Sequence, residues 1–462
     1  MNIPVERTWV EVFGAGKGSR YLRILSLIER SIAEGQLQPG DRLPPQRRVA
    51  ELLGVDLTTV TRAYAEAKER GLLESRGPSG TFVSAPAVDF AQRIDLSMNM
   101  PPAPEGVELS SFLRKGLAEV LARNNADLLM TYHAGGGSRA DRMAGCRWLE
   151  PMFGPLDVSR IAVCPGAQSA LAALVLALTR PGDTILAEPL VYPGLISVAE
   201  SLSRRVVAVA TDEDGMRPGA LEQACDARGA TVLYLNPTIQ NPVARTMSAT
   251  RRKALAKVAQ RKGLRIIEDD PYWLFEEQAP EPVACWAPAS TYYISTLSKC
   301  ITPGLRTAYV LMPAGQDEAS FLNALRSFAL MASPLPTALA TQWVHDGSAR
   351  HLLDRVRAES WGRHDLASGI LGMPLRESGR GIHIWHALPA RWTAPELARA
   401  ALAEGLSVTP SVAFAPGAEP SPPNAVRLSL GAVRGRALLA DALSRLKALL
   451  EREPGAGRRL VI

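Results

Sequence analysis

The sequence lacks the features that mark secreted or membrane-spanning proteins. Its five cysteines show no paired spacing, which argues against a disulfide framework or a metal site; they are Cys146, Cys164, Cys225, Cys285 and Cys300. The longest apolar run, Ala170–Leu178, is far shorter than the roughly 20 residues that cross a bilayer. The N-terminus carries charges and no apolar segment typical of a signal peptide. We therefore expect a cytoplasmic protein with no membrane partner and no bound metal.

A strong charge of one sign is also absent. The formal net charge is +6, with 47% hydrophobic and 21% charged residues, which is ordinary for a globular protein. This balance is compatible with a nucleic-acid partner but does not indicate one. At roughly 150 residues per domain, a chain of 462 residues is expected to form two to four domains.

The first part of the chain has a helical pattern followed by a hairpin signal. Apolar residues recur at helical spacing in 21–35, and shorter helices are expected over 46–55 and 56–71, with Asp56 as an N-cap. Two β-prone pieces, 72–74 and 81–84, flank a Gly/Pro/Ser turn. Helix, helix, turn, helix and hairpin is the order of a winged helix-turn-helix.

From about residue 95 the pattern changes. Short β-rich runs such as "DTILAEP", "TVLYLNP" and "LRIIEDDP" alternate with helical stretches. This alternation predicts an α/β domain with a mostly parallel central sheet. We expect a domain over 1–84, a linker over 85–94 and a second domain over 95–455, with a small C-terminal α+β subdomain from about 330.

The segment "GQLQPGDRLPPQRRVAELLGVDLTTVTRAYAEAKERGLLESRGPSGTFV" resembles the GntR family of bacterial regulators in its spacing. It departs from the family at Asp56–Leu57, where a Ser and often an Arg are usual. The resemblance implies binding to double-stranded operator DNA. Short polar and basic side chains would reach bases from the third helix, and other arginines would reach phosphates. The candidates are Thr58, Thr59 and Arg62 on that helix, Arg47 and Arg48 before it, and Arg76 in the wing. The alternative is a helical protein-interaction module with a solvated basic face.

In the second part, Lys299 lies in "STLSKCITPGLRTAYV". A lysine that forms a Schiff base with an aldehyde cofactor needs a fixed position and a lowered amine pKa. Thr296, Ser298 and Arg306 provide the hydroxyls and the guanidinium that a phosphate would need. The turn "CPGAQ" leads into a helix, and its backbone N–H groups at Gly166, Ala167 and Gln168 are expected to face an anion.

Further candidates follow predicted strands. Asn241 lies in "LNPTIQNP", and Asp269 and Tyr272 lie in "IIEDDPYW", at the strand ends where α/β sheets place ligands. A carboxylate there would keep a pyridine nitrogen protonated. Tyr192 in "EPLVYPG" is a candidate for stacking on the ring, and Arg427 in "NAVRLSLG" for binding a carboxylate. Each residue taken alone also fits a core or surface position.

As a set, these residues resemble the fold-type-I aminotransferases over roughly 95–450. The resemblance implies pyridoxal 5'-phosphate as cofactor, with Lys299 as the internal aldimine lysine. It pairs Asp269 with the pyridine nitrogen, with Asp270 as the alternative, and assigns the ring hydroxyl to Asn241 and Tyr272. Tyr132 in "TYHAGGGS" matches a tyrosine that reaches the partner subunit's phosphate, although the family's following Asp-Pro is absent here.

A GntR-like head joined to an aminotransferase-like body is similar to the MocR-type subfamily of GntR regulators. The resemblance implies a head-to-tail homodimer that binds pyridoxal phosphate, senses an amine or amino acid, and controls genes of vitamin B6, amine or amino-acid metabolism. We expect a regulator and not primarily an enzyme. Two alternatives stay open, which are an active aminotransferase and a cofactor-free dimeric DNA-binding protein.

Overall fold

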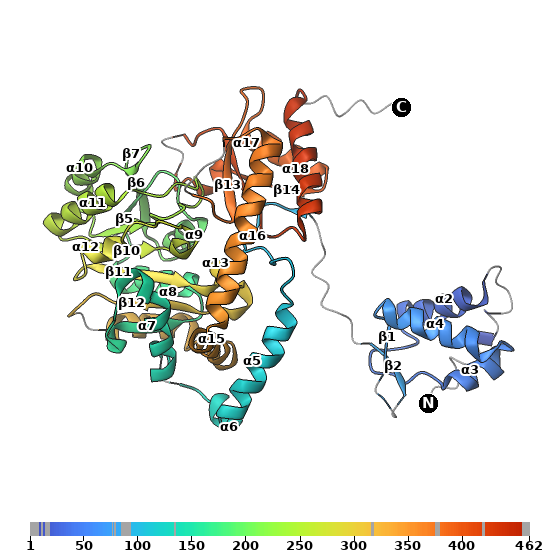
Figure 1. Ribbon diagram of the computed structural model, residues 1–462. Helices are drawn as coiled ribbons and strands as arrows, with labels where there is room; N and C mark the ends of the chain where they lie inside the picture. The colour runs from blue at the N-terminus through green and yellow to red at the C-terminus, as the bar shows by residue number, and fades with distance from the viewer. Residues whose placement is uncertain are drawn as a thin grey trace. The chain divides into compact units, whose positions relative to one another are not determined.

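The computed structural model divides into two compact units, Met1–Gln92 and Arg93–Ile462, which we call the head and the body. The structure describes residues 9–10, 13, 19–75, 77, 80–84, 94–133, 135–315, 318–374, 379–417 and 421–454. Arg76 and residues 85–93 of the expected linker lie outside these ranges. The two units are described separately below (Figure 1).

The head has the helices and the hairpin that the sequence predicted. Its elements are α2 (Arg20–Ala33), α3 (Gln46–Leu53), α4 (Leu57–Glu69), β1 (Leu73–Ser75) and β2 (Thr81–Val83). The two strands pair antiparallel. Ile28, Val60 and Tyr64 are buried in a core shared by the helices and the hairpin.

The link between α3 and α4 is a tight turn. Gly54 ends α3 with a φ of 62°, in the left-handed region that favours glycine. Asp56 occupies the N-cap position of α4, but its side chain makes no capping hydrogen bond. The hydroxyl of Thr61 donates to the side chain of Gln46 at 2.8 Å and ties the two helices together. The geometry is that of a helix-turn-helix with a two-stranded wing.

The body contains all the remaining elements. Its strands are β3 (Ile94–Asp95), β4 (Ile161–Cys164), β5 (Thr184–Ala187), β6 (Arg205–Ala208), β7 (Thr211–Asp212), β8 (Gly215–Met216), β9 (Val232–Leu235), β10 (Arg265–Asp269), β11 (Thr291–Thr296), β12 (Ala308–Leu311), β13 (His383–Ala387), β14 (Leu406–Ser407), β15 (Thr409–Pro410) and β16 (Ala425–Ser429). Its helices are α5 (Leu109–Arg123), α6 (Ala126–Leu129), α7 (Arg139–Phe153), α8 (Ala167–Leu178), α9 (Pro193–Ser201), α10 (Pro218–Arg228), α11 (Ala249–Lys262), α12 (Val283–Trp286), α13 (Leu297–Cys300), α14 (Ala319–Ala329), α15 (Pro334–Asp346), α16 (Ser348–Leu371), α17 (Ala394–Ala403) and α18 (Arg436–Glu451). Short 3₁₀ helices are η2 (Val158–Arg160), η3 (Trp273–Phe275), η4 (Pro303–Leu305) and η5 (Ser411–Phe414).

Within the described residues, a seven-stranded sheet has the order β4-β12-β11-β10-β9-β5-β6. All its neighbouring strands pair parallel except β12, which runs antiparallel to β11 and β4. The predicted mostly parallel sheet is therefore confirmed. Because the parallel strands end at one edge, the residues that follow β9, β10 and β11 meet there.

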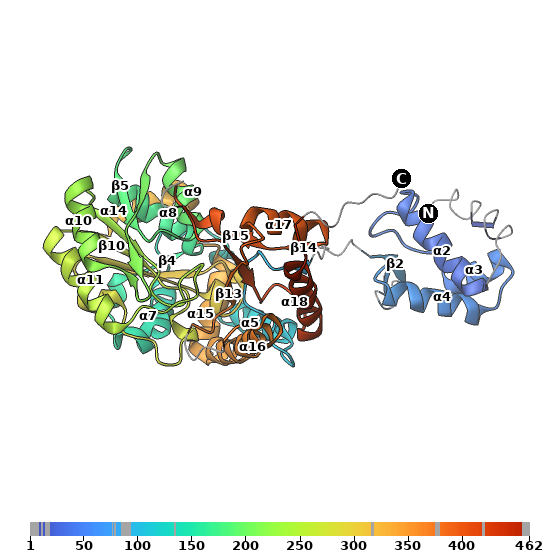
Figure 2. The same cartoon turned by 90° about the horizontal axis from the view of Figure 1, so that it is seen from above.

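Alternate residues of the sheet face two separate cores. In β9, Val232 and Tyr234 pack with α8 and α9, whereas Leu233 and Leu235 pack with α10 and α11. Farther along the sheet, α7, α15 and α16 pack on the α10 side. Figure 2 shows α8 and α9 on one side of the strands, with α7 and α15 on the other. The strands are buried on both faces, as in other parallel sheets.

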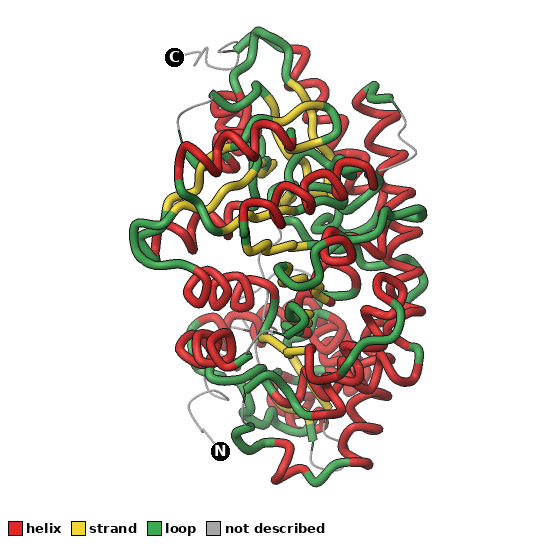
Figure 3. Tube along the Cα trace, turned by 90° about the vertical axis from the view of Figure 1, so that its left-hand side faces the viewer, coloured by secondary structure: helices red, strands yellow, loops and turns green. Residues whose placement is uncertain are grey.

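A smaller sheet, β13-β16-β15, packs on α17, α18 and the end of α16. The region expected from about 330 also contains α15, which packs on the large sheet instead. The body's first strand, β3, pairs parallel with β14 of this region. Residues 94–95 therefore join the small subdomain, which the sequence analysis had placed only after 330. In Figure 3 the strands are yellow and the helices that lie beside them are red. None of the helices in the described ranges is both long and apolar enough to span a membrane.

Candidate functional site

Most of the residues predicted for a cofactor pocket line one cavity at the carboxyl edge of the large sheet. The lining residues are Ala167, Tyr192, Asn236, Asn241, Asp269, Pro271, Tyr272, Thr296 and Lys299. They lie at or after the carboxyl ends of β4, β5, β9, β10 and β11, so the strand order brings together residues that are far apart in sequence. The cavity is a place where a small molecule would contact all these elements at once.

Lys299 lies in the short helix α13, which directly follows β11. Its amine donates a hydrogen bond to the backbone oxygen of Asn99. Burial lowers the pKa of Lys299 to about 8, and the nearby charge of Arg427 acts in the same direction, whereas Asp269 opposes it. A lysine in this state is partly neutral near physiological pH, as a nucleophilic amine must be.

Asp269 and Asp270 point in opposite directions because they are consecutive residues at the end of a strand. Asp269 accepts a hydrogen bond from the Tyr234 hydroxyl at 2.8 Å, and its Oδ1 has no partner among the described residues. Burial raises the pKa of Asp269 to about 6. Of the two carboxylates, Asp269 alone lines the cavity, and it has an oxygen free for a ligand.

Asp270 is engaged elsewhere. It accepts a hydrogen bond from Thr238 at 2.7 Å and lies 3.9 Å from the fully buried Arg252 of α11. This carboxylate therefore belongs to the structural contact between the sheet and α11. The geometry favours Asp269 over Asp270 as the ligand-facing group.

One end of the site is suited to an anion. A Cβ added to Gly166 would lie 2.6 Å from the guanidinium of Arg306, so the glycine leaves room for that side chain. Ser298 is buried, and its hydroxyl has no hydrogen-bond partner in the described part of the chain. The Thr296 hydroxyl, by contrast, donates to the backbone oxygen of Thr307 and accepts from the N–H of Ser298. Its hydrogen is thus already used within the fold.

The helix turn that was expected to bind an anion differs in one detail. The N–H of Gly166 donates to the backbone oxygen of Cys164 at 2.8 Å, so this group does not face a ligand as predicted. The reason is the tight turn itself, in which Gly166 is the N-cap of α8 with a φ of 94°. Ala167 and Gln168 are the first residues of α8, where backbone N–H groups have no partner within the helix.

The opposite side of the site contains Arg427, which is buried on β16. Its guanidinium donates to the side chain of Asn241 at 2.9 Å and to the backbone oxygen of Ser97, while its Nε has no partner among described residues. Burial lowers the pKa of Arg427 to about 10. Tyr192, at the start of α9, is half-buried beside the same cavity. A carboxylate arriving here would meet a guanidinium with spare donor capacity.

Three residues of the site were missed by the sequence analysis. Asn99 donates to the hydroxyl of Tyr272 at 2.8 Å in addition to binding Lys299. Tyr234 holds Asp269, and the Asn236 side chain donates to the backbone oxygen of Asp269 at 2.6 Å. Tyr234 and Asn236 are two residues apart at the end of β9, a spacing that could have revealed them. Asn99 follows no strand pattern of this kind.

Two groups of predicted residues do not line this cavity. Tyr132 is 81% exposed and does not contribute to the pocket of its own chain. In the head, Arg47, Arg48, Thr58 and Arg62 are exposed and Thr59 is half-buried. The Arg62 guanidinium lies 4.1 Å from the centre of the Tyr21 ring. Thr58, Thr59 and Arg62 share the outer side of α4, as a DNA-reading helix requires.

A comparison with protein-family models decides the identity of the body. Residues 94–446 match the family described as aminotransferase class I and II. The chain belongs to the aminotransferase class I and II family. A second model, described as bacterial regulatory proteins of the gntR family, matches residues 20–83. The chain is thus a fusion of a GntR-type DNA-binding domain with an aminotransferase-family domain, which is the predicted MocR-type architecture.

Relatives with the same layout are regulators by name. The uncharacterized HTH-type transcriptional regulator YdeF of Bacillus subtilis (strain 168) is 29% identical over 437 residues, covering 93% of this chain and 94% of YdeF. The HTH-type pyridoxine biosynthesis transcriptional regulator PdxR of Corynebacterium glutamicum is 27% identical, covering 77% of this chain and 80% of PdxR. At 93% of this chain, the match to YdeF includes parts of both the GntR-type head and the aminotransferase-family body.

Solved structures support the fold of the aminotransferase-family domain. LysN, an α-aminoadipate aminotransferase from Thermus thermophilus, superposes with a TM-score of 0.69 at 23% identity, over 77% of this chain and 92% of LysN. That structure contains N-(5'-phosphopyridoxyl)-L-leucine. The class I and II aminotransferase family depends on pyridoxal phosphate. The unpartnered oxygens of Asp269 and Ser298 and the space at Gly166 fit such a group.

Proposed function

We propose that this protein is a pyridoxal-phosphate-binding transcription regulator whose body senses the cofactor and an amine or amino acid. The observation that carries the proposal is the pairing of a GntR-type head with a cavity where Lys299 and Asp269 face the same space. The names of its relatives support the regulatory role. With DNA as its partner, we place the protein in the cytoplasm.

In this proposal each pocket residue has one task. Lys299 is the point of covalent attachment, and Asp269 accepts a hydrogen bond from the protonated ring nitrogen and keeps it protonated. Asn241 and Tyr272 hold the ring hydroxyl, and Tyr192 stacks on the ring. The phosphate is held at the Gly166 turn by the N–H groups of Ala167 and Gln168 and by Ser298 and Arg306. Thr296, predicted as a further phosphate ligand, instead supports Ser298 by accepting its backbone N–H, because its own hydrogen is bonded to Thr307. When bound, pyridoxal phosphate supplies an aldehyde and an electron-withdrawing ring.

The charges around the cavity agree with this assignment. Lys299, Arg306 and Arg427 bring positive charge to a site in which Asp269 is the nearby carboxylate. An excess of positive charge suits a phosphate and a carboxylate-bearing effector. We assign the effector's carboxylate to Arg427, whose Nε is free of partners in the described structure.

The lowered pKa of Lys299 predicts a pH profile for cofactor attachment. Below a pKa of about 8, the neutral fraction of the amine rises about tenfold per pH unit, and above it the fraction levels off. The rate of attachment to the apoprotein should follow this curve when measured by absorbance from about pH 6 to pH 10. Free Nα-acetyl-lysine, measured alongside, should level off only near its ordinary pKa of about 10.4. A protein profile with the same midpoint as the free amine would contradict the prediction.

Gly166→Ala tests the anion end of the pocket. The new Cβ would lie 2.6 Å from the Arg306 guanidinium, so we expect the cofactor's dissociation constant to rise about tenfold or more. Gly182→Ala is the matched control, because Gly182 has a similar φ of 89° but nothing within 4 Å of the added Cβ. Titration with pyridoxal phosphate measures both variants. Equal effects would show that backbone strain, and not the contact with Arg306, is responsible.

We also propose that the protein acts as a head-to-tail homodimer, in which Tyr132 reaches the partner's phosphate site. Support comes from exposed large apolar side chains on two segments that meet beside Tyr132. Met130 and Leu330 are exposed, and the N–H of His133 contacts the sulfur of Met331. Apolar side chains gathered on a surface mark an interface more often than a solvated face. Sedimentation of the full chain would show a monomer if this part of the proposal is wrong.

A band-shift experiment tests the regulatory function. Full-length protein would be titrated onto the DNA upstream of its own gene at one salt concentration, with and without pyridoxal phosphate. We expect a specific complex whose affinity or footprint changes with the cofactor, and which is lost when Thr58 and Thr59 are both replaced by alanine. No specific complex at any cofactor concentration would refute the proposal.

An active aminotransferase is the second candidate, because Lys299, Asp269 and Arg427 are all present in one region. It predicts steady turnover of an amino acid with a keto acid by the isolated protein. Turnover together with DNA binding that ignores the cofactor would favour this alternative.

A further inference from the structure

A second cavity lies behind the loop that carries Asn236 and Asn241. It has a volume of about 340 Å³, within the usual range for small-molecule sites. The lining residues are Glu188, Pro189, Leu190, Thr211, Asp212, Asp214, Gly215, Asn236, Pro237, Gln240, Val243, Arg245, Thr246, Met247, Trp385 and Pro423. Asn236 lines both this cavity and the cofactor pocket, so the two are neighbours. The cofactor and effector roles proposed above assign no ligand to this second cavity.

Glu188 is the buried acid of this cavity. It directly follows β5 and is 8% exposed, and it accepts a hydrogen bond from the N–H of Met216 at 3.1 Å. No salt bridge joins Glu188 to a cation in the part of the chain that the structure describes. A buried carboxylate is costly unless a positive charge accompanies it. Glu188 therefore has no cation bonded to it in the described structure, and a cationic ligand would stabilise its charged form.

The other acids of the cavity are already paired. Arg251 lies 2.9 Å from Asp212 and 3.7 Å from Asp214, and it is also the cation whose charge acts on Glu188 from a distance. Arg245, which also lines the cavity, is exposed and donates to the backbone oxygen of Glu213. Burial raises the pKa of Glu188 to about 7 despite the opposing influence of Arg251. Glu188 also receives a side-chain hydrogen bond from Gln240, and it is the cavity's carboxylate that has no salt bridge in the described structure.

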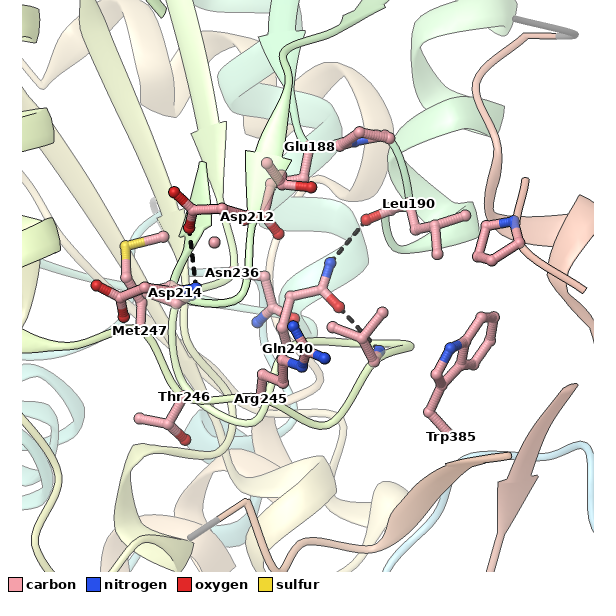
Figure 4. Close-up of a pocket in the computed structure, with 16 residues that line it drawn as sticks. Glu188, Leu190, Asp212, Asp214, Asn236, Gln240, Arg245, Thr246, Met247 and Trp385 are labelled. Atoms are coloured by element: carbon pink, nitrogen blue, oxygen red, sulfur yellow. Dashed lines mark hydrogen bonds between the residues drawn. The ribbon is translucent and has the colours of Figure 1, made fainter. Parts of the chain in front are cut away.

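Trp385 of β13 forms the facing wall. Figure 4 shows its indole ring across the cavity from Asp212 and Asp214, with Gln240 and Arg245 between them and Glu188 at another side. The ring is half-buried and meets Phe414 edge-on, with ring centres 6.1 Å apart at 81°. Tryptophan is the side chain whose face attracts organic cations most strongly.

We propose that this cavity binds a small organic cation, an amine or a quaternary ammonium ion, with its positive charge near Glu188 and its apolar part against Trp385. Such a ligand brings the counter-charge that Glu188 lacks and covers the indole face. The binding is non-covalent and does not involve Lys299. It also does not depend on DNA binding, so this proposal and the regulatory one can fail separately.

The cavity is linked to the cofactor pocket by direct contacts. Phe414 lies between Trp385 and Arg427, whose guanidinium is 5.0 Å from the centre of the Phe414 ring. The backbone oxygen of Phe414 accepts a hydrogen bond from Val191, next to Tyr192. Trp385 and Arg427 are also paired across β13 and β16. A ligand that packs on Trp385 therefore contacts a side chain that packs on Phe414. Phe414 in turn contacts Arg427 and the backbone beside Tyr192, both assigned to the cofactor pocket.

The test uses benzyltrimethylammonium, which has an aromatic ring and a fixed positive charge and cannot condense with an aldehyde. Calorimetric titration into the full-length protein loaded with pyridoxal phosphate should show one saturable site per chain. The same site should remain in Lys299→Ala, while benzyl alcohol and benzoate should bind at least about tenfold more weakly. The proposal would be overturned if no saturable binding were seen up to about 10 mM of the ligand.

Two substitutions locate the site. Glu188→Gln and Trp385→Ala should each raise the dissociation constant about tenfold, whereas Glu222→Gln and Trp361→Ala, which lie outside the cavity, should leave it unchanged. Trp385→Phe keeps a ring beside Phe414 and should keep most of the affinity, which guards against a folding defect in Trp385→Ala. Binding that survives either Glu188→Gln or Trp385→Ala would overturn the assignment.

Discussion

Lys299→Ala is expected to abolish covalent attachment of pyridoxal phosphate while the body remains folded. The amine of Lys299 lines the cavity and has a lowered pKa, and no other lysine lines that cavity in the described structure. Borohydride reduction followed by mass measurement should add one cofactor to the native protein and none to the variant. The absorbance band of the attached cofactor should be lost as well.

The fold should tolerate this change because the buried amine does not stabilise it. The pKa of Lys299 is about 8 in the folded protein and roughly 10.4 when unfolded, so its protonation favours the unfolded state. This destabilisation is fully present below about pH 8 and disappears as the pH rises through the unfolded value. At pH 7 the apo variant should melt at the native temperature or higher. Lys257→Ala, which removes an exposed lysine of α11, is the control, and stoichiometric trapping in Lys299→Ala would refute the assignment.

Sequence spacing was sufficient to predict the head. Helix periodicity placed α2, α3 and α4, and the Gly/Pro/Ser turn placed the hairpin, because each of these signals is local. In the body, the β-rich runs predicted the strands, and their carboxyl ends gave the position of the pocket. The pairing of β3 with β14 was not predictable, since two short strands about 310 residues apart carry no mutual signal.

The pocket shows the same division between local and distant information. Lys299, Asp269 and Asn241 follow predicted strands, so their meeting was foreseen. Asn99 was missed because its contacts with Tyr272 and Lys299 join segments about 170 and 200 residues apart. The use of the Gly166 N–H within its own turn was also unforeseen, since a sequence does not show which local acceptor a glycine turn will use.

The choice between Asp269 and Asp270 shows how strand geometry resolves a sequence ambiguity. Side chains alternate along β10, so Ile267 and Asp269 face the α8 side, whereas Glu268 and Asp270 face the α11 side. The sequence "EDD" alone does not reveal which side holds the pocket. Once α8 is placed beside it, Asp269 must face the cavity and Asp270 the helix.

Asp269→Asn and Asp270→Asn should consequently change different properties, the first cofactor affinity and the second folding stability. In Asp269→Asn the group facing the pocket loses its charge, so the dissociation constant for pyridoxal phosphate should rise about ten- to hundredfold. The folding stability should change little, because the amide oxygen can still accept the hydrogen bond from Tyr234. Titration of the cofactor and thermal melting of the apoprotein measure the two quantities.

Asp270→Asn should leave cofactor affinity nearly unchanged and destabilise the body, because the fully buried Arg252 would lose its counter-charge. Burial raises the pKa of Asp270 to about 6, so the loss should stay below the roughly 3 kcal/mol of a closely paired buried ion pair. The melting temperature of the apoprotein should therefore fall in Asp270→Asn and stay near the native value in Asp269→Asn. Each variant is the control for the other, since the substitutions are chemically identical and the positions are adjacent. If Asp270→Asn weakened the cofactor and Asp269→Asn did not, the roles of the two carboxylates would have to be exchanged.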